Sequence, residues 1–392
     1  MQCKYHNRGL CHSCTLIDQP YSVQLAQKAA GVRDALETAG AEHEHVRWLE
    51  PVPSAQTGFR NKAKMVVAGT VDRPRLGILD PGGRGVDLRD CPLYPEAVGQ
   101  ALQSVAEFSA RLKLLPYNVA KGRGELKHVL LTVSPDAELM LRFVLRSPRQ
   151  VERIRNQLPW LHAELPGLRV VSVNLQPEHK AVLEGPEEIL LTEQDSLRMR
   201  VNHVDLRLRS RSFFQTNTEV AAALYRLAAR WAEQINPSRV LDLYCGVGGF
   251  ALHLAGAARS VVGVEVSTEA VTAAREAADD LGLPESAVRF QAGDATTWDS
   301  QLGSTSGASN SGYDDAAADL IVVNPPRRGL GAPLARRLDR SAAQSMIYSS
   351  CNATTLARDV ALMPSWRVVE GQVLDMFPHT GHYEVALRLQ RK

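Results

Sequence analysis

Residues 240–250 read VLDLYCGVGGF, and this stretch decides the fold of the C-terminal half of the chain. Its first residues are apolar and predict a buried strand, with the acidic Asp242 near the carboxyl end. The glycine-rich turn 246–249 follows, and an apolar periodic run from Phe250 onward predicts a helix. A strand, a glycine turn and a helix place backbone N–H groups where a ligand can approach closely. The stretch therefore predicts a binding loop.

A second predicted strand, 260–266, distinguishes among the ligands that this loop could bind. It carries Glu265, about twenty residues beyond the glycines, where a carboxylate can hold the hydroxyls of a ribose. No third glycine follows at the spacing of dinucleotide-binding loops, and the first strand carries an acid. This combination resembles the S-adenosylmethionine loop of class I methyltransferases. A nucleotide site and a purely structural turn are the two weaker interpretations.

Length and composition limit the class of protein. A chain of 392 residues is too long for one typical hydrophobic core, so two or three domains are expected. With 44% apolar and 22% charged residues, the composition predicts a soluble globular protein. No apolar run approaches the length of a membrane span, and the first residues lack the apolar core of a signal peptide, so a cytoplasmic protein is expected. The net charge of +2 permits a nucleic-acid partner but does not require one.

The C-terminal part of the chain alternates predicted strands with predicted helices. Such alternation predicts an α/β fold with a parallel, doubly wound sheet. Thr216 and Glu219 have the spacing of a capping box in front of a long amphipathic helix that ends near Gln234. Two last strands, joined by a short hairpin turn at 378–381, are expected to add an antiparallel edge. The expected strands are 240–244, 260–266, 288–292, 319–323, 345–350, 368–376 and 383–389.

The residues before this part predict a different architecture, an α+β region with an antiparallel sheet. Helices are expected at 22–39 and 95–115, and the stretch 197–208 is strand-like. The segment 300–318, rich in Gly, Ser, Ala and Asp, is interpreted as a flexible insertion. We therefore expect three domains, covering residues 1–94, 95–210 and 211–392.

Cys351 follows the last predicted parallel strand, in the sequence YSSCN at 348–352. Ligands of doubly wound sheets bind beyond the carboxyl ends of the strands, so Cys351 is expected on the same rim as Gly246 and Glu265. A cysteine there is a candidate nucleophile, although a lone cysteine is more often a small buried residue. The loop NPPRR at 324–328 has an arginine where amine-methylating enzymes carry an aromatic residue, which argues against amine methylation.

Four cysteines in the N-terminal region, Cys3, Cys11, Cys14 and Cys91, form a second candidate site. In a reducing compartment they are not expected to form structural disulfides. Four thiolates suit either a zinc ion or an iron–sulfur cluster, and the spacing alone does not decide between them. Four unrelated buried cysteines are the remaining alternative.

Five stretches, taken together and in order, resemble the RNA uracil-C5 methyltransferases. The N-terminal MQC, the pair Cys11 and Cys14, the stretch FRNKAKM at 59–65 and Cys91 resemble the branch of that family that acts on uracil 747 of 23S rRNA. The resemblance covers nearly the whole chain. The five stretches are SFFQTN at 212–217, LDLYCGVGGF at 241–250, NPPRRG at 324–329, YSSCN at 348–352 and DMFPHTGHYEVAL at 375–387.

The resemblance implies a class I, Rossmann-like methyltransferase domain and a covalent mechanism. Carbon C5 of uracil is too weak a nucleophile to take a methyl group directly, and addition of a thiolate to C6 makes it reactive. By resemblance, Cys351 is that nucleophile and Glu384 is the base that removes the C5 proton. A carboxylate that acts near neutral pH benefits from a raised pKa, which a partly dry site supplies.

The resemblance also implies the ligands of the protein. Residues at four positions, Gln215, Tyr244, Glu265 and Asn324, are expected to hold S-adenosylmethionine or the reacting base. The four N-terminal cysteines are expected to hold a structural [4Fe-4S] cluster. The expected macromolecular partner is 23S rRNA, with no membrane and no obligate protein partner. Basic residues expected to contact RNA phosphates are Arg60, Lys62, Lys64, Lys121, Arg123, Lys127, Arg142, Arg146 and Arg149.

Three other functions compete with this interpretation. RNA cytosine-C5 methyltransferases share the fold, but many carry a cysteine in the loop that here reads Pro325-Pro326-Arg327. A methyltransferase for a different rRNA or tRNA uridine is the second alternative, and the tRNA relatives lack the cysteine cluster. A non-catalytic RNA-binding or RNA-folding protein is the third, and the presence of both Cys351 and Glu384 argues against it.

Overall fold

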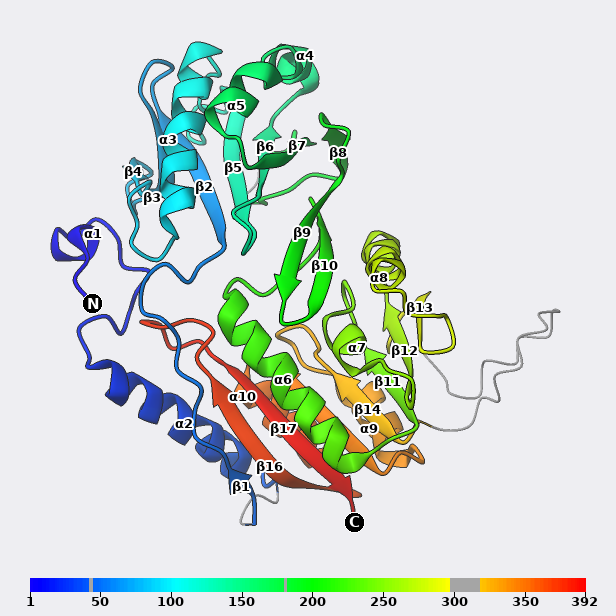
Figure 1. Ribbon diagram of the computed structural model, residues 1–392. Coiled ribbons are helices and arrows are strands. Elements are labelled where there is room, and N and C mark those ends of the chain that lie inside the picture. Colours follow the sequence, from blue (N-terminus) through cyan, green and yellow to red (C-terminus); the bar gives the residue numbers. More distant parts are fainter. Residues whose placement is uncertain (42–44, 180–181, 297–317) are drawn as a thin grey trace.

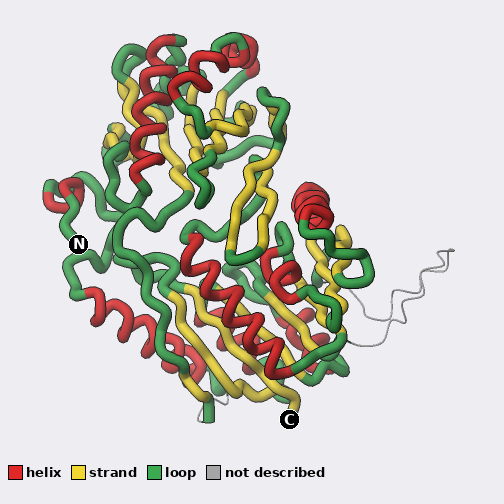
Figure 2. The backbone as a smooth tube through the Cα atoms, viewed as in Figure 1, coloured by secondary structure: helices red, strands yellow, loops and turns green. Residues whose placement is uncertain are grey.

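The computed structural model describes residues 1–41, 45–179, 182–296 and 318–392. Its strands form two large sheets, joined by a two-stranded hairpin (Figure 2). The predicted insertion at 300–318 lies outside the described residues, apart from its last position. Within the described chain, no helix is both long and apolar enough to cross a membrane.

The C-terminal sheet has eight strands in the order β1-β16-β17-β15-β14-β11-β12-β13. Five consecutive strands of this sheet, β15-β14-β11-β12-β13, pair in parallel, as the alternating pattern predicted. The strand order reverses between β11 and β14, and such a reversal opens a crevice at the carboxyl ends of the two strands. The five parallel strands are β11 (Arg239–Leu243), β12 (Ser260–Glu265), β13 (Val288–Ala292), β14 (Leu320–Val323) and β15 (Ser345–Ser350).

The remaining strands of this sheet confirm the predicted antiparallel edge and correct one detail. Strand β17 (Glu384–Arg391) pairs antiparallel with both β15 and β16 (Trp366–Leu374). The connection between β16 and β17 is the whole loop 375–383, so the predicted short hairpin turn is wrong. Strand β1 (Arg47–Trp48), which was not predicted, pairs parallel with β16 at the edge.

Helices cover both faces of this sheet (Figure 1). One face packs against α6 (Thr218–Ile235), α7 (Gly249–Leu254) and α8 (Thr268–Asp280) in one hydrophobic cluster. The other face packs against α9 (Ala332–Arg340), α10 (Ala353–Ala361) and α2 (Tyr21–Thr38) in a second cluster. The sheet is thus the middle layer between two hydrophobic cores, as is typical of α/β domains.

The N-terminal end of α6 differs from the prediction. The capping residue is Asn217, whose side chain accepts a hydrogen bond from the Val220 N–H at 3.3 Å. Thr216 instead uses its carbonyl to accept from the Asn61 N–H at 2.8 Å. The capping box at Thr216 was therefore wrong by one residue, because a contact from a distant segment fixes the chain before the helix begins.

The N-terminal sheet has seven strands in the order β4-β3-β2-β5-β6-β7-β8, and all its pairs except β6–β7 are antiparallel. This confirms the predicted α+β architecture. The helices of this region are α1 (Lys4–Asn7), α3 (Glu96–Arg111), the 3₁₀ turn η1 (Pro148–Gln150), α4 (Val151–Arg155) and α5 (Leu158–Glu164). The strands are β2 (Lys62–Gly69), β3 (Pro74–Leu79), β4 (Gly85–Asp87), β5 (Leu126–Val133), β6 (Leu139–Leu145), β7 (Leu168–Leu175) and β8 (Glu187–Leu190).

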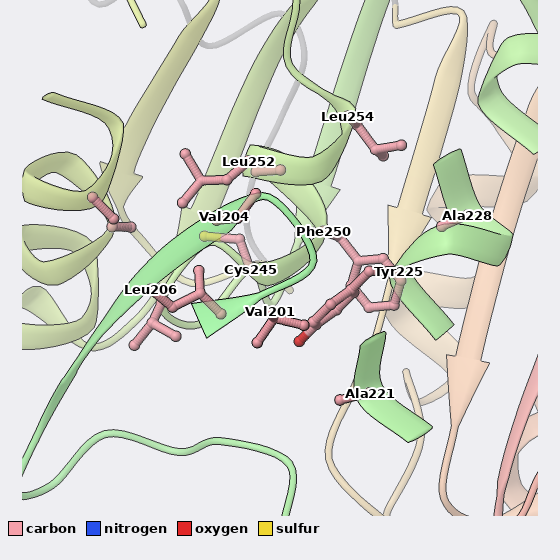
Figure 3. Close-up of a cluster of buried hydrophobic side chains, with 14 of the residues drawn as sticks. Val201, Val204, Leu206, Ala221, Tyr225, Ala228, Cys245, Phe250, Leu252 and Leu254 are labelled. Carbon is pink, nitrogen blue, oxygen red and sulfur yellow. The ribbon is translucent and has the colours of Figure 1, made fainter. Parts of the chain in front are cut away.

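The stretch predicted as one strand at 197–208 is a hairpin of β9 (Ser196–Val201) and β10 (Val204–Arg209). Asn202 turns the chain with a φ of +54°, a left-handed conformation that Asn tolerates better than most residues. Apolar residues of the hairpin join the core beside α6 and α7 (Figure 3). Cys245 is buried in the same core.

The predicted domain limits remain a prediction, and the sheets divide the chain differently. Strands β2–β4, from the expected first domain, share a sheet with β5–β8 of the expected second domain. Helix α2 and strand β1, also from the expected first domain, pack with the C-terminal sheet. Helix α2 and strand β1 therefore belong structurally with the C-terminal part, whereas residues 1–17 pack against β3 and β4.

Candidate functional site

The candidate site lies at the rim where β11 and β14 end and the strand order reverses. Tyr244 and the glycine turn 246–249 follow β11, and Asn324 follows β14. Cys351 follows the neighbouring strand β15. The structure thus brings these predicted site residues to one edge of the sheet.

Backbone geometry explains why glycine occupies the turn. Gly246 and Gly248 have φ values of +54° and +86°, which side chains other than glycine rarely adopt. At Gly249 the constraint is space, because a Cβ atom would lie 2.3 Å from the hydroxyl oxygen of Tyr225. Because these positions carry no side chain, a ligand at the carboxyl ends of the strands can approach the backbone of the turn closely.

Asp242 anchors the helix behind this turn. Its Oδ2 accepts from the Ala251 N–H at 3.0 Å, in the first turn of α7. Its Oδ1 is buried without a hydrogen-bond partner among the described residues. Burial raises the pKa of this carboxyl to about 8.

Glu265 is fixed at the end of β12 by two backbone donors. Its carboxylate accepts from the Gly246 N–H at 3.2 Å and from the Ser267 N–H at 2.9 Å. The predicted acidic residue is thus joined to the glycine turn itself. Its binding of a ribose remains a prediction.

Tyr244 has an unusual backbone at this rim. Its φ is +64°, a region that costs a residue with a bulky side chain free energy and that often marks functional sites. Burial raises the pKa of its hydroxyl, and the negative charge of Asp294 adds to this shift. The Tyr244 hydroxyl therefore lies near enough to Asp294, in the loop after β13, to be affected by its charge.

Cys351 lies between β15 and α10, partly exposed. Burial raises the pKa of its thiol, and the charge of Glu384 adds to that shift. A hydrogen bond with Arg327 and the positive charge of Arg327 act in the opposite direction. The surroundings of Cys351 therefore contain both a carboxylate and a cation.

Glu384 begins β17 and is 1% exposed. Burial raises the pKa of its carboxyl to about 7. The hydroxyl of Ser349 donates a hydrogen bond to Oε1 of this side chain. Such a carboxyl exchanges its proton near neutral pH, as the predicted general base requires.

The loop after Asn324 is held against the start of α10. The carbonyl of Arg327 accepts from Asn352 Nδ2 and from Thr355 Oγ1, each at 3.1 Å. Further along, Asp359 Oδ2 accepts from the Leu330 N–H and from the Tyr348 hydroxyl, each at 2.7 Å. These contacts bring Arg327 to Cys351.

Sequence reasoning assigned no site role to Arg327, Ser349 or Asp359. The proximity of Arg327 to Cys351 depends on packing between a loop and a helix, which no local pattern encodes. Ser349 had one available signal, since it lies two residues before Cys351 and residues two apart share a face of a strand.

Gln215 lies at the entrance to α6, where it is buried. Its carbonyl accepts from Asn61 Nδ2 at 3.0 Å, and the same amide donates to Thr218 Oγ1 at 2.8 Å. The segment before β2 is thus tied to the segment that carries Gln215. Contact of the Gln215 side chain with a ligand remains a prediction.

The loop 375–383, which leads into Glu384, is held by α2. Lys28 Nζ donates to Asp375 Oδ1 at 2.6 Å and to the Phe377 carbonyl at 3.1 Å. The Tyr21 hydroxyl donates to Asp375 Oδ2 at 2.8 Å. An N-terminal helix therefore positions the last loop of the site.

The four N-terminal cysteines lie in one cluster. Cys3, Cys11, Cys14 and Cys91 belong to the same small hydrophobic group, and none forms a disulfide. Burial raises the pKa of Cys14 to about 12, and the charges of the other three thiols add to that shift. Among the residues that the structure describes, no group of three or more His, Cys, Asp or Glu side chains is arranged to hold a metal ion. The structure thus gathers four thiols of the right chemistry without showing a metal site.

Two of the basic residues expected to contact RNA are buried instead. Arg142 is 2% exposed and pairs with Glu188 and Glu184. Lys127 is 5% exposed and donates to the Glu178 carbonyl at 2.6 Å. These two predictions were wrong, because their positions on β5 and β6 turn the charges into the protein.

Comparison with known proteins shows the family to which the chain belongs. The family model described as tRNA (uracil-5-)-methyltransferase matches residues 186–392, which is more than half of the chain. This chain belongs to the RNA uracil-C5 methyltransferase family. It is therefore an S-adenosylmethionine-dependent RNA (uracil-C5) methyltransferase.

Two relatives of this methyltransferase match along nearly their whole length. Both are described as 23S rRNA (uracil(747)-C(5))-methyltransferase. The relative from Xenorhabdus bovienii is 46% identical, over 98% of this chain and 97% of its own. The relative from Escherichia coli K12 is 45% identical, over 100% of both chains.

A solved structure shares the fold of this methyltransferase. It is the Pyrococcus abyssi tRNA (uracil-54, C5)-methyltransferase in complex with S-adenosyl-L-homocysteine. The two chains are 28% identical, with a TM-score of 0.77 over 97% of this chain and 84% of the other. The predicted class I methyltransferase fold is confirmed.

Proposed function

We propose that this protein methylates C5 of uridine 747 in 23S rRNA through a covalent adduct between Cys351 and C6 of the uracil. The relatives described with that activity are 45% to 46% identical over nearly the whole chain, whereas the tRNA-methylating structure is 28% identical. The observation that carries the proposal is that Cys351, directly after β15, lies near Glu384, the buried first residue of the adjacent strand β17.

The first step is addition of the Cys351 thiolate to C6. Sγ forms a bond to C6, and the electrons of the C5=C6 double bond move to C5 and the C4 carbonyl. The charge of Arg327 favours the thiolate, while burial opposes it. C5 is then nucleophilic enough to attack a methyl group, which S-adenosylmethionine supplies when bound.

The second step restores the ring. Glu384 accepts the C5 proton, the C5–H electrons re-form the double bond, and the C6–Sγ electrons return to the sulfur. A carboxyl with a pKa of about 7 accepts this proton near neutral pH and releases it afterwards. The products are the 5-methyluridine, S-adenosylhomocysteine as the leaving group of the methyl transfer, a protonated Glu384 and a free Cys351 thiolate.

The cofactor-binding roles are part of the same proposal. Glu265, which is fixed to the glycine turn, accepts from ribose hydroxyls. Tyr244 packs against the cofactor from its strained position. Gln215 and Asn324 hold the cofactor or the uracil edge, where an amide can both donate and accept.

We infer that the four N-terminal cysteines hold a [4Fe-4S] cluster with a structural role. The observation that supports this is the gathering of Cys3, Cys11, Cys14 and Cys91 as free thiols in one group. Methyl transfer requires no redox step, so no step of the reaction passes through a cluster. The cluster would tie the first residues of the chain to the loop at Cys91.

The proposed substrate has two consequences. The target uridine must leave its stack before C6 can meet a thiolate, so a loop or a flipped nucleotide is required. An rRNA substrate also places the protein in the cytoplasm. The absence of an obligate protein partner remains a prediction.

Mapping of 5-methyluridine tests the proposed function. Ribosomal and transfer RNA from cells with and without the gene are compared, with a Cys351→Ala allele as the control. We expect loss of the modification at position 747 of 23S rRNA, restored by the wild-type gene alone. Loss at a tRNA uridine, or at no uridine, contradicts the proposal.

A further inference from the structure

The pairing of β15 with β17 places two site residues on one face of the sheet. Ser349 is opposite Ala386, and Ser350 is opposite Val385. Directly opposite residues share a face, as do residues two apart in a strand, so Ser349, Ala386 and Glu384 lie on the face that packs against α6. Cys351 follows the last paired residue of β15, and the charge of Glu384 affects its thiol.

The carboxylate of Glu384 has one hydrogen bond in the part of the chain that the structure describes, and it comes from Ser349. Both side chains are buried, with 0% and 1% exposure. The opposite neighbour on β16 is the apolar Leu374.

The other ionisable groups near Glu384 are the hydroxyl of Tyr225, from α6, and the thiol of Cys351. Burial raises the pKa of both groups, and the charge of Glu384 adds to each shift. For Glu384 itself, burial raises the pKa of the carboxyl, and the hydrogen bond from the Ser349 hydroxyl is the contact that lowers it.

We propose that Ser349 is a positioning residue, whose hydroxyl holds Oε1 of Glu384 and keeps this carboxylate ionised and ready to accept the C5 proton. This inference rests on the proposed role of Glu384 as the base. A carboxylate has two oxygens, so engagement of Oε1 by a donor leaves Oε2 for the transferred proton.

The physical effect has a defined sign. Burial raises the pKa of Glu384, and the hydrogen bond from Ser349 acts against burial by favouring the charged form. Without the hydroxyl, the pKa of Glu384 rises further. A larger fraction of the enzyme then carries a protonated Glu384 at neutral pH, which cannot accept a proton.

The test measures proton removal directly. The substrate is an unmodified 23S rRNA transcript that carries tritium at C5 of uridine, and the release of tritium is measured. The pH is varied from about 5.5 to about 9, so that it extends at least about 1.5 units to either side of pH 7. For Ser349→Ala we expect an acidic limb shifted upward by about one pH unit, which from a pKa of about 7 lowers the rate at pH 7 about fivefold. Ser349→Thr, which keeps the hydroxyl, should restore both.

Matched controls separate this role from a general packing effect. Ser345→Ala removes a buried hydroxyl from the same face of the same strand, remote from Glu384, and should leave the pH profile unchanged. If Ser349→Ala does not fold, Ser349→Thr and Ser349→Val form a second pair that differs mainly in the hydroxyl. The acidic limb of the pH–rate profile should then lie at higher pH for Ser349→Val than for Ser349→Thr.

A second measurement distinguishes failure of the inference from failure of the proposed function. RNA with 5-fluorouridine has no C5 proton to remove, so its adduct forms without the base. We expect wild type and Ser349→Ala to form this adduct to the same extent. A wild-type pH profile in Ser349→Ala overturns the role of Ser349, whereas no adduct in the wild type overturns the proposed function.

Discussion

Lys28 Nζ lies 2.6 Å from Oδ1 of Asp375, and the two side chains are 2% and 0% exposed. This buried ion pair joins α2, near the start of the chain, to the loop that leads into Glu384. Tyr21 and Gln24 of the same helix also bond to this loop, at Asp375 and at the His379 N–H. The N-terminal helix therefore contributes to the rim of the candidate site through the loop that leads into Glu384.

Replacement of Lys28 tests this relationship. Lys28→Met leaves the buried Asp375 charge without its cation, and we expect the free energy of unfolding to fall by about 3 kcal/mol. Lys28→Met combined with Asp375→Asn should recover part of this loss. Denaturant unfolding measures both effects, with the exposed Gln27→Met on the same helix as control. Equal stability of Lys28→Met and Gln27→Met would show that the pair has no structural role.

Replacement of Glu384 by glutamine should increase stability while it abolishes turnover. The pKa of this buried carboxyl rises from 4.5 to about 7 on folding, so the protein loses stability as pH rises through that interval. Glu384→Gln removes this penalty, and Gln can still accept from Ser349. We expect a gain on the order of 1–3 kcal/mol at pH 8 and little change at pH 4.

Thermal unfolding at the two pH values, together with turnover assays, checks this prediction. The same variant should accumulate a methylated covalent adduct with ordinary RNA. A Glu384→Gln enzyme that turns over at the wild-type rate excludes Glu384 as the base.

The sequence predicted the parts of this fold that depend on local pattern. The strands of the C-terminal sheet and the glycine turn follow from hydrophobic period and glycine spacing. Strand β1 and the contact between Lys28 and Asp375 join segments more than three hundred residues apart, and no local pattern encodes them. The N-cap of α6 is Asn217 and not the predicted Thr216 for the same reason, because the Asn61 N–H donates to the Thr216 carbonyl.

The candidate site also combines residues that local pattern predicts with residues whose positions depend on long-range contacts. Cys351, Glu265 and Tyr244 could be placed at the rim from the ends of predicted strands. The approach of Arg327 to Cys351 could not, because it depends on the contact between the loop after β14 and α10. Arg142 was predicted to bind RNA from its charge alone, and its burial depends on pairing with residues of the segment around β8.

Salt dependence distinguishes basic residues that meet RNA from those that do not. Lys64 is exposed on β2, so Lys64→Met should weaken RNA binding and reduce the slope of log affinity against log salt by about 1. Arg142→Met should lower stability and leave that slope unchanged, because Arg142 is buried and paired. Binding titrations at several salt concentrations test both variants. An unchanged slope in Lys64→Met places that residue outside the RNA-binding surface.

Metal content tests the cysteine cluster. Protein purified without oxygen should be brown and contain about four irons per chain. Cys14→Ser should lose this iron, whereas Cys245→Ala, in the methyltransferase core, should retain it. Removal of the iron by a chelator should lower the unfolding temperature. Colourless protein with one zinc per chain contradicts the iron–sulfur assignment.

Covalent trapping tests the central claim most directly. The wild-type enzyme, S-adenosylmethionine and 23S rRNA containing 5-fluorouridine are incubated together, and mass spectrometry of the digested complex locates the cross-linked residue. We predict a methylated 5-fluorouridine attached to Sγ of Cys351, and no such species with Cys351→Ala. Absence of any adduct from the wild-type enzyme, or an adduct at a different residue, would contradict the account.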